Sequence, residues 1–136
     1  MPYEILDHTA DFGVRIYGKT LEELFKSGFE AIVNAMVEIK WKGERKELVY
    51  SDSAETLEDL LVDFLSEVIF RTIVEGKVFT DCEIKIEGTS INAKLFYEDY
   101  DPERHRLKKE IKSVTYHNLE IRKTPDGFET YLICDV

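Results

Sequence analysis

The sequence has few cysteines, and this excludes one class of small protein. Only two of its 136 residues are cysteines, Cys82 and Cys134, and each lies in an apolar-rich segment with a strand-like pattern. Two cysteines do not make the disulfide framework of a small secreted domain, and thiols among apolar residues are usually buried and reduced. We therefore expect two buried free thiols in a protein of the reducing cytoplasm.

Long apolar runs are also absent from the sequence. No stretch approaches the roughly 20 apolar residues that cross a bilayer as a helix. The first residues, Met-Pro-Tyr-Glu-Ile-Leu-Asp, have neither a basic start nor a long apolar segment, so they do not resemble a secretory leader. This predicts a soluble, intracellular protein with no membrane partner.

Positive charge is scarce. The 18 Lys and Arg residues are outnumbered by 28 Asp and Glu residues, which gives a formal net charge of -10. Lys and Arg make most contacts to phosphates, and an acidic protein repels a polyanion at long range. Direct DNA binding is not expected, and a role with tRNA would have to be indirect, through a partner protein.

What the sequence does contain is typical of a folded domain. Hydrophobic residues make up 43% of the chain and charged residues 34%, without low-complexity tracts. A chain of this length buries roughly two-thirds of its unfolded surface when it folds, enough for one core. We expect a single domain over residues 1–136, ordered almost from end to end.

Two amphipathic helices are predicted. Apolar residues recur at three- and four-residue steps over residues 21–36 and 57–74. Each segment follows a threonine, Thr20 or Thr56, with an acidic residue three positions later, which is the pattern of a capping box. Both helices should therefore begin directly after their threonine.

The other regular segments show strand-like patterns. They are residues 3–6, 12–17, 44–50, 78–86, 91–97, 113–122 and 128–134. Thr-Pro-Asp-Gly at 124–127 is typical of a hairpin turn, and the insert 98–109 is predicted to be a surface loop with a basic patch, Arg104 to Lys109. This order predicts an α+β fold, with both helices packed on one face of a largely antiparallel β-sheet.

Aspartates gather near both ends of the chain. Asp7 and Asp11 bound the segment Asp-His-Thr-Ala-Asp, and the sequence ends with Asp135 and Val136. Carboxylates and main-chain carbonyls are hard oxygen donors that suit Ca²⁺ or Mg²⁺, whereas nothing here resembles a thiol-rich zinc site. From the residues alone two interpretations stay open: a metal site built from both chain ends, or aspartates that only cap turns.

The last predicted strand indicates to which face the Asp135 side chain points. Side chains alternate between the two faces of a strand, so Phe128, Thr130, Leu132 and Cys134 share one face and Asp135 points to the other. Cys134 would then pack in the core while Asp135 reaches solvent or a metal. The competing interpretation is a frayed terminal residue without a partner.

Four motifs in order resemble the archease family. They are the His-Thr-Ala-Asp loop ending at Asp11, the Thr-Leu-Glu-Glu helix start at Thr20, the Lys-x-Val-Thr-Tyr-His segment at 112–117 and the apolar-Asp-apolar tail at 134–136. The resemblance covers residues 3–136. Archeases are known as accessory proteins of the GTP-dependent tRNA-splicing RNA ligase, which joins 2′,3′-cyclic phosphate or 3′-phosphate ends to 5′-OH ends. The resemblance implies an activator of ligase guanylylation and multiple turnover, not an enzyme.

The resemblance also implies which residues form the site. Asp11 and Asp135 would bind a divalent cation directly, Ca²⁺ in the first place and Mg²⁺ or Mn²⁺ as alternatives, and Val136 would add a carbonyl or carboxylate oxygen. Asp7 would act through water or shape the loop. Lys112 would contact a phosphate, GTP at the ligase interface, or an acidic group of the ligase. A tag fused after Val136 should be harmful.

Two histidines leave other hypotheses open. Imidazole beside carboxylates can serve as a general base, so one alternative is a small metal-dependent phosphohydrolase, with Asp11 and Asp135 as ligands and His8 or His117 as base. No Ser or Cys nucleophile motif or Walker loop accompanies them, and we favour structural hydrogen bonds that hold Asp11 and Lys112 in place. A further alternative is a chaperone-like modulator of a tRNA methyltransferase, a role also proposed for the archease family.

Overall fold

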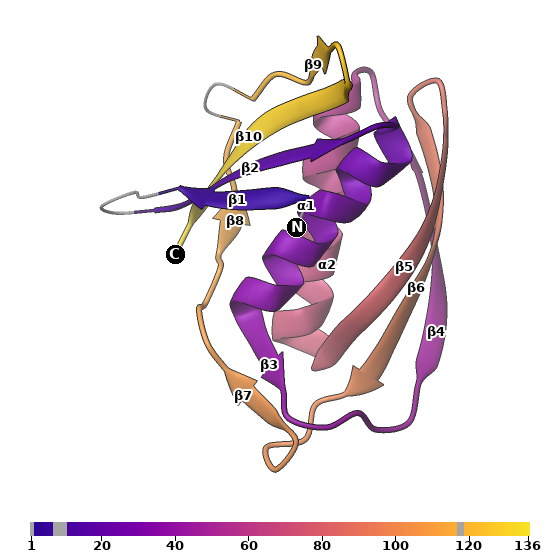
Figure 1. Cartoon of the computed structure of the whole chain (residues 1–136). Helices are drawn as coiled ribbons and strands as arrows, with labels where there is room; N and C mark the ends of the chain where they lie inside the picture. The colour runs from indigo at the N-terminus through magenta and orange to yellow at the C-terminus, as the bar shows by residue number, and fades with distance from the viewer. Residues whose placement is uncertain (1, 7–10, 117–118) are drawn as a thin grey trace.

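The computed structural model describes residues 2–6, 11–116 and 119–136, which form two helices and ten strands (Figure 1). The helices are α1 (Leu21–Met36) and α2 (Leu57–Glu75). The strands are β1 (Tyr3–Leu6), β2 (Phe12–Gly18), β3 (Val37–Ile39), β4 (Lys46–Ser53), β5 (Lys77–Glu87), β6 (Ser90–Asp99), β7 (His105–Leu107), β8 (Ser113–Val114), β9 (Arg122–Thr124) and β10 (Gly127–Asp135). The strand pairings among these residues are antiparallel, so the predicted α+β class is confirmed.

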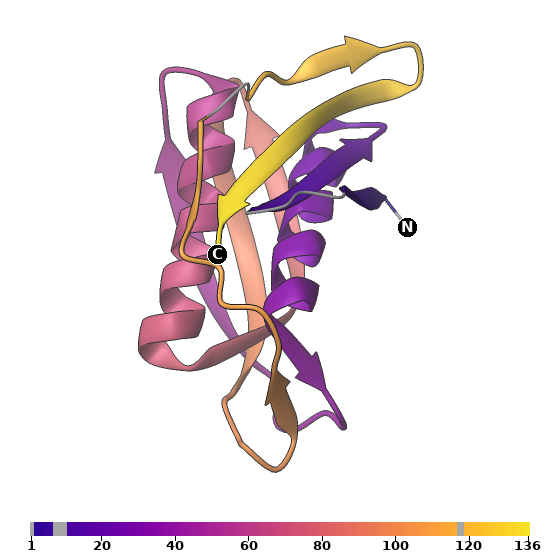
Figure 2. The ribbon, with the colours of Figure 1, turned by 90° about the vertical axis from the view of Figure 1, so that its left-hand side faces the viewer.

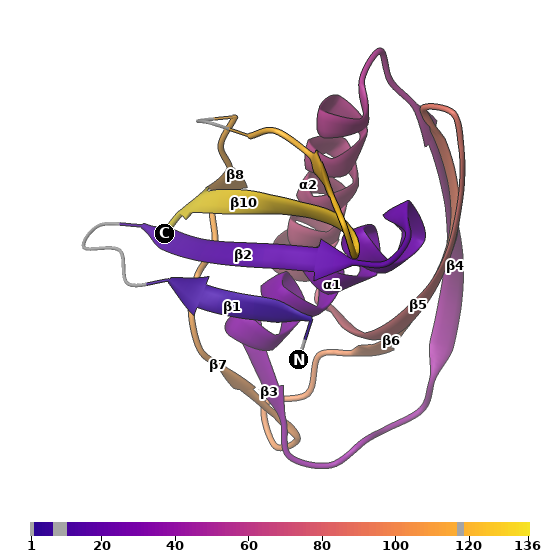
Figure 3. The same cartoon turned by 45° about the horizontal axis from the view of Figure 1, so that its top comes forward.

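The strands divide among three sheets where the sequence suggested one. Sheet A has the order β1-β2-β10-β8, with β9 also paired to β10; β3 pairs with β7; and sheet C has the order β4-β6-β5. The helices lie between sheets A and C, and α1 contacts β2 on one side and β5 on the other (Figure 2; Figure 3). A helix pair with broad apolar faces can cover two sheets at once, which a one-sheet prediction does not anticipate.

Both helices begin as the capping pattern predicts. The Thr20 side chain accepts a hydrogen bond from the Glu23 N–H at 3.1 Å, and Thr56 accepts one from the Asp59 N–H at 3.0 Å. Each cap satisfies a backbone donor that the helix itself leaves unpaired, which typically contributes about 1 kcal/mol. The two helices start at Leu21 and Leu57, as expected.

Aromatic rings fill the space between the helices and sheet C. Phe64 of α2 stacks on Phe25 and Phe29 of α1 with ring centroids 6.1 and 6.4 Å apart, and Phe29 meets Phe79 of β5 edge-on at 6.0 Å. Burying each such side chain contributes on the order of 1.5–3 kcal/mol. Gly28 lets α1 approach Ile16 of β2 closely, because a Cβ at this position would lie only 3.3 Å from the Ile16 side chain.

One predicted strand is wrong in its length. Residues 113–122 form only β8 and the start of β9, and the chain that the structure describes between them is irregular. Its backbone has other partners: the Leu119 N–H bonds to the Tyr116 carbonyl at 3.2 Å, and the Ile121 N–H bonds to the Glu58 carboxylate on α2 at 2.9 Å. The apolar pattern there reflects packing of Leu119 and Ile121 on the core, not strand pairing.

The insert at 98–109 is more ordered than a surface loop. Its first two residues end β6, and β7 pairs with β3, two short strands that the sequence did not reveal. A strand of three residues shows no measurable alternation, so only its partner defines it. The predicted hairpin at 124–127 is confirmed: it joins β9 to β10, and Gly127 has a φ of 147° that other residues rarely adopt.

The predicted burial of both cysteines is confirmed. Cys82 and Cys134 are both buried free thiols. Among the described residues, neither helix is both long and apolar enough to cross a bilayer.

Candidate functional site

The C-terminal strand meets the start of β2 at one corner of sheet A. In their register Cys134 pairs with Phe12, and Asp135 and Asp11 are the next residues beyond this last pair. The end of the chain lies beside the start of β2 and beside β8 (Figure 1; Figure 2). Burial raises the pKa of the Cys134 thiol to about 12, and the negative charges of Asp135 and Asp11 add to this rise. Both aspartates therefore lie near enough to the Cys134 thiol for their charges to act on it, at the corner of sheet A where β2 begins and β10 ends.

Lys112 joins this corner through its backbone. The Lys112 N–H donates to the Asp135 carbonyl at 2.8 Å, and the Ser113 hydroxyl donates to Asp135 Oδ2 at 3.1 Å. β8 consists of two residues, of which Ser113 pairs with Asp135. The short strand thus fixes the exposed Lys112 next to the end of β10.

Asp135 is not a frayed end. Thr130, Leu132 and Cys134 are buried while Asp135 is exposed, as the alternation predicts. Its carbonyl and its carboxylate both accept hydrogen bonds. The competing interpretation, a terminal residue without a partner, is wrong.

The donors in this corner suit a hard cation. Asp11 and Asp135 supply carboxylates, and Val136 is exposed beside them. The Cys134 thiol is buried and points to the opposite face of β10 from Asp135, so it offers no ligand on the exposed side of this corner. Among the described residues no cluster of three His, Cys, Asp or Glu side chains is close enough to hold an ion, so further oxygen ligands would have to come from Val136, from water or from another segment.

Three of the predicted site residues are not covered by the structure. Asp7, His8 and His117 lie outside the described residues. The corner therefore contains Asp11, Lys112, Asp135 and Val136 of the predicted set, together with Ser113, which the sequence did not single out. Its position directly after Lys112, at the start of a strand, is the only signal that could have pointed to it.

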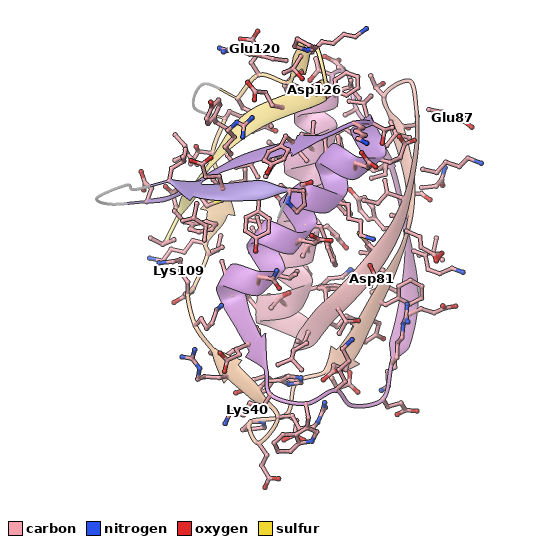
Figure 4. The ribbon with its side chains drawn as sticks, in the orientation of Figure 1. Lys40, Asp81, Glu87, Lys109, Glu120 and Asp126 are labelled. Atoms are coloured by element: carbon pink, nitrogen blue, oxygen red, sulfur yellow. The ribbon has the colours of Figure 1, made fainter. Side chains whose placement is uncertain are left out.

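A hollow of about 670 Å³ adjoins the corner at Asp11. Apolar side chains and three cations line it: Ile5, Leu6, Phe12, Ala35, Arg106, Lys108 and Lys109. The Lys109 ammonium lies 6.0 Å from the centre of the Phe12 ring. In Figure 4 Lys109 lies on the side of the molecule where β10 ends. Positive charge is thus concentrated next to Asp11.

A second hollow, of about 730 Å³, lies at the other end of sheet A, where Asp126 is labelled in Figure 4. Its charged side chains largely form ion pairs with each other or with neighbouring residues. Arg15 bonds to Glu129 at 2.8 Å, and Lys26 lies 3.2 Å from Asp81. This hollow lacks the concentration of one charge seen beside Asp11.

The basic patch predicted at Arg104 to Lys109 divides into two parts. Arg104 and His105 face inward, where both bind the buried carboxylate of Glu98. Arg106, Lys108 and Lys109 are exposed and line the hollow beside Asp11. Of these residues Lys108 and Lys109 offer charge to a ligand, because Arg106 is paired with Glu38.

Comparison with known proteins points to one family over nearly the whole chain. Residues 3–136 match the sequence profile of the Archease protein family. The protein archease of Pyrococcus abyssi is 42% identical over 130 residues, covering 92% of this chain and 91% of its own. That of Methanopyrus kandleri is 32% identical over 140 residues, with both chains covered completely.

Two solved structures share the fold. The solution structure of a Methanobacterium thermoautotrophicum protein superposes with a TM-score of 0.69 at 26% identity, over 99% of each chain. The crystal structure of a Thermotoga maritima protein, described as an archease and possible chaperone, has a TM-score of 0.70 at 27% identity, over 96% of this chain and 94% of that one. This chain belongs to the archease family.

Proposed function

We propose that this protein is an accessory protein that docks on a GTP-dependent tRNA-splicing RNA ligase and promotes its guanylylation and multiple turnover. Membership of the archease family supports an accessory role. The observation that carries the site is the 2.8 Å hydrogen bond between the Lys112 N–H and the Asp135 carbonyl. It holds the backbone of Lys112 beside Asp135, and Asp11 directly precedes Phe12, the residue of β2 that pairs with Cys134.

In this proposal the acidic pair holds a divalent cation. Asp11, Asp135 and Val136 would be the ligands, with Ca²⁺ preferred over Mg²⁺ or Mn²⁺ because Ca²⁺ accepts oxygen ligands in less regular geometry. A bound ion would supply positive charge toward phosphate. Lys112, exposed next to Asp135, would contact a phosphate of GTP or an acidic group at the ligase interface.

The ligase, not this chain, would perform the covalent chemistry. Burial raises the pKa of Cys82 and Cys134 to about 12, so neither thiol is an available nucleophile. The net charge of -10 also disfavours a direct hold on tRNA. We therefore infer that tRNA is reached only through the ligase.

Multiple-turnover ligation by the cognate ligase, with GTP and divalent metal, tests this function. Native protein should accelerate ligation, while Asp135→Ala and Lys112→Met should remove most of the acceleration. Matched controls are Asp126→Ala and Lys123→Met, exposed residues at the other end of β10. Equal loss in the controls, or no acceleration by the native chain, would contradict the proposal.

A chaperone function is the second candidate, because the similar Thermotoga maritima protein is described as a possible chaperone. A chaperone would raise the soluble yield of a partner, such as a tRNA methyltransferase, without GTP and without Asp135. Solubility of the co-expressed partner with native protein and with Asp135→Ala separates the two functions. Phosphohydrolysis by the purified chain alone would instead favour the phosphohydrolase alternative.

A further inference from the structure

The outer edge of β1 borders the hollow next to Asp11. β1 is the last strand of sheet A, and among the described residues no other strand pairs with its outer side (Figure 3). The Tyr17 N–H bonds to the Pro2 carbonyl at 3.1 Å, which sets the alternation of the ladder. In an antiparallel pair every second residue bonds inward, so Tyr3 and Ile5 direct their N–H and C=O groups outward. The edge can therefore accept one more strand.

Ile5 shows that this edge is incompletely covered. It pairs with Val14, so the two side chains lie on the same face of sheet A, the face that packs on the helices. Val14 is completely buried, whereas Ile5 is 62% exposed. Ile5 stays exposed on the core side of the sheet because α1, which covers this face, ends near Ala35. Ala35 lines the same hollow.

The opposite wall of the hollow carries positive charge. Arg106 is bound to Glu38 by two hydrogen bonds of 3.3 and 3.2 Å, but no carboxylate within the described part of the chain forms an ion pair with Lys108 or Lys109. Asp11 is the acidic residue that lines the hollow. The two lysines are held in place through their backbone, since their N–H groups bond to the last turn of α1 at 2.9 and 3.1 Å.

We propose that this groove binds an extended acidic segment of a partner protein, which adds a strand to the outer edge of β1. Its backbone would pair with Tyr3 and Ile5, and the side chains on the strand face that looks into the hollow would include an apolar residue over Ile5 and Asp or Glu residues next to Lys108 and Lys109. Binding would occur whether or not the partner is an RNA ligase, so the ligation assay and the binding assay can fail independently.

A peptide fits this groove better than a nucleic acid does. A polypeptide strand can satisfy the open backbone groups of β1, which RNA cannot do in the same regular way. The apolar lining from Ile5, Leu6 and Phe12 suits aliphatic side chains. The long-range field of a protein with a charge of -10 also repels a polyanion more strongly than a short peptide with a few carboxylates.

The test is a titration of the isotope-labelled full chain, followed by NMR, with the synthetic peptide Thr-Val-Thr-Glu-Thr-Glu, whose Val and Glu side chains share one face of a strand. We expect saturable shifts of the Tyr3 and Ile5 amide signals. The double variant Lys108→Glu/Lys109→Glu should weaken binding by about tenfold or more, as for close charge pairs at an interface. The matched control is Lys85→Glu/Lys94→Glu, which changes the net charge equally but lies on β5 and β6.

Three results would overturn the proposal. The first is the absence of saturable shifts with the peptide. The second is equal binding of a peptide with N-methylated backbone amides, which keeps the charge but cannot pair as a strand. The third is stronger binding of an oligouridylate of equal charge at the same signals, which would make the groove a nucleic-acid site.

Discussion

The molecule holds two clusters of charge that differ in what surrounds them. Around Glu98, which is 2% exposed, both carboxylate oxygens have partners: one binds Arg104 and His105, the other the Gly43 N–H. The His105 ring is also fully used, because Nε2 faces Glu98 at 2.6 Å and Nδ1 accepts the Asp101 N–H at 2.8 Å. This buried cluster is complete within the chain.

The corner at Asp135 is the opposite case. Its backbone is fixed by Lys112, but the Asp135 carboxylate and the Lys112 ammonium are exposed. A buried charge has to be paired by the chain that buries it, whereas an exposed charge is stable in water without a partner. The buried cluster therefore stabilises the fold, and the exposed corner is available to a ligand.

The largest expected effect is on stability, from loss of the Glu98 charge. Glu98→Ala leaves Arg104 and His105 without their shared acceptor, and breaking a buried pair of this kind costs on the order of 3–5 kcal/mol. Urea unfolding followed by circular dichroism measures the loss. Asp135→Ala should lose less than about 1 kcal/mol in the same experiment, as an exposed side chain. Equal losses would break the distinction between the two clusters.

For the stability that is gained from Ca²⁺, Asp135 should matter more than Glu98. If the corner binds Ca²⁺, the free energy of unfolding rises by about 2.7 kcal/mol at a concentration one hundred times the dissociation constant. Glu98→Gln, where it folds, should keep this increment, and Asp135→Ala should lose it. Thermal unfolding with and without Ca²⁺ gives both values. A Ca²⁺ increment unchanged in Asp135→Ala would place the ion elsewhere.

Acid should perturb the buried cluster selectively, by a smaller amount. Burial raises the pKa of Glu98, but the hydrogen bonds from Gly43, His105 and Arg104 outweigh it and hold the pKa below its ordinary 4.5. The unfolded chain then binds this proton more readily than the native one, so stability falls as pH drops below about 4.5. Glu98→Gln should show a shallower acid slope in unfolding free energy than native protein. An identical slope would contradict this assignment.

The smallest effect on stability is expected from Ser113→Ala. It removes one exposed hydrogen bond to Asp135, worth about 0.5 kcal/mol. Its effect on metal binding should be larger, about tenfold in affinity, because the hydroxyl orients a ligand carboxylate. Calorimetric titration with Ca²⁺ measures this affinity. Loss of stability without any change in affinity would show that Ser113 only supports the strand.

The helices could be predicted closely from the sequence, whereas several strands could not. Long periodic segments with a threonine cap define α1 and α2 by local signals. β3 and β7 are defined only by each other, about seventy residues apart (from Glu38 to Arg106). Glu98 and His105 gave no signal as partners, because a polar insert with a histidine is also typical of a solvated loop.

The candidate site could be predicted only through the family resemblance. Asp11 and Asp135 lie at the same corner of sheet A because Phe12 pairs with Cys134, and periodicity within either strand does not contain that pairing. Lys112 reaches them through β8, a strand of two residues. The roles given to Asp7, His8 and His117 stay predictions, since these residues lie outside the described part.

The rate of ligase guanylylation is the most direct test of whether the corner at Asp135 and Lys112 activates the ligase. Purified cognate ligase, GTP and Ca²⁺ or Mn²⁺ would be combined with native protein, Asp135→Ala, Lys112→Met or the control Asp126→Ala, each checked for folding. We expect faster formation of the covalent ligase–guanylate with native protein and the control, and little acceleration with the two site variants. Acceleration that survives in folded Asp135→Ala and Lys112→Met would contradict it.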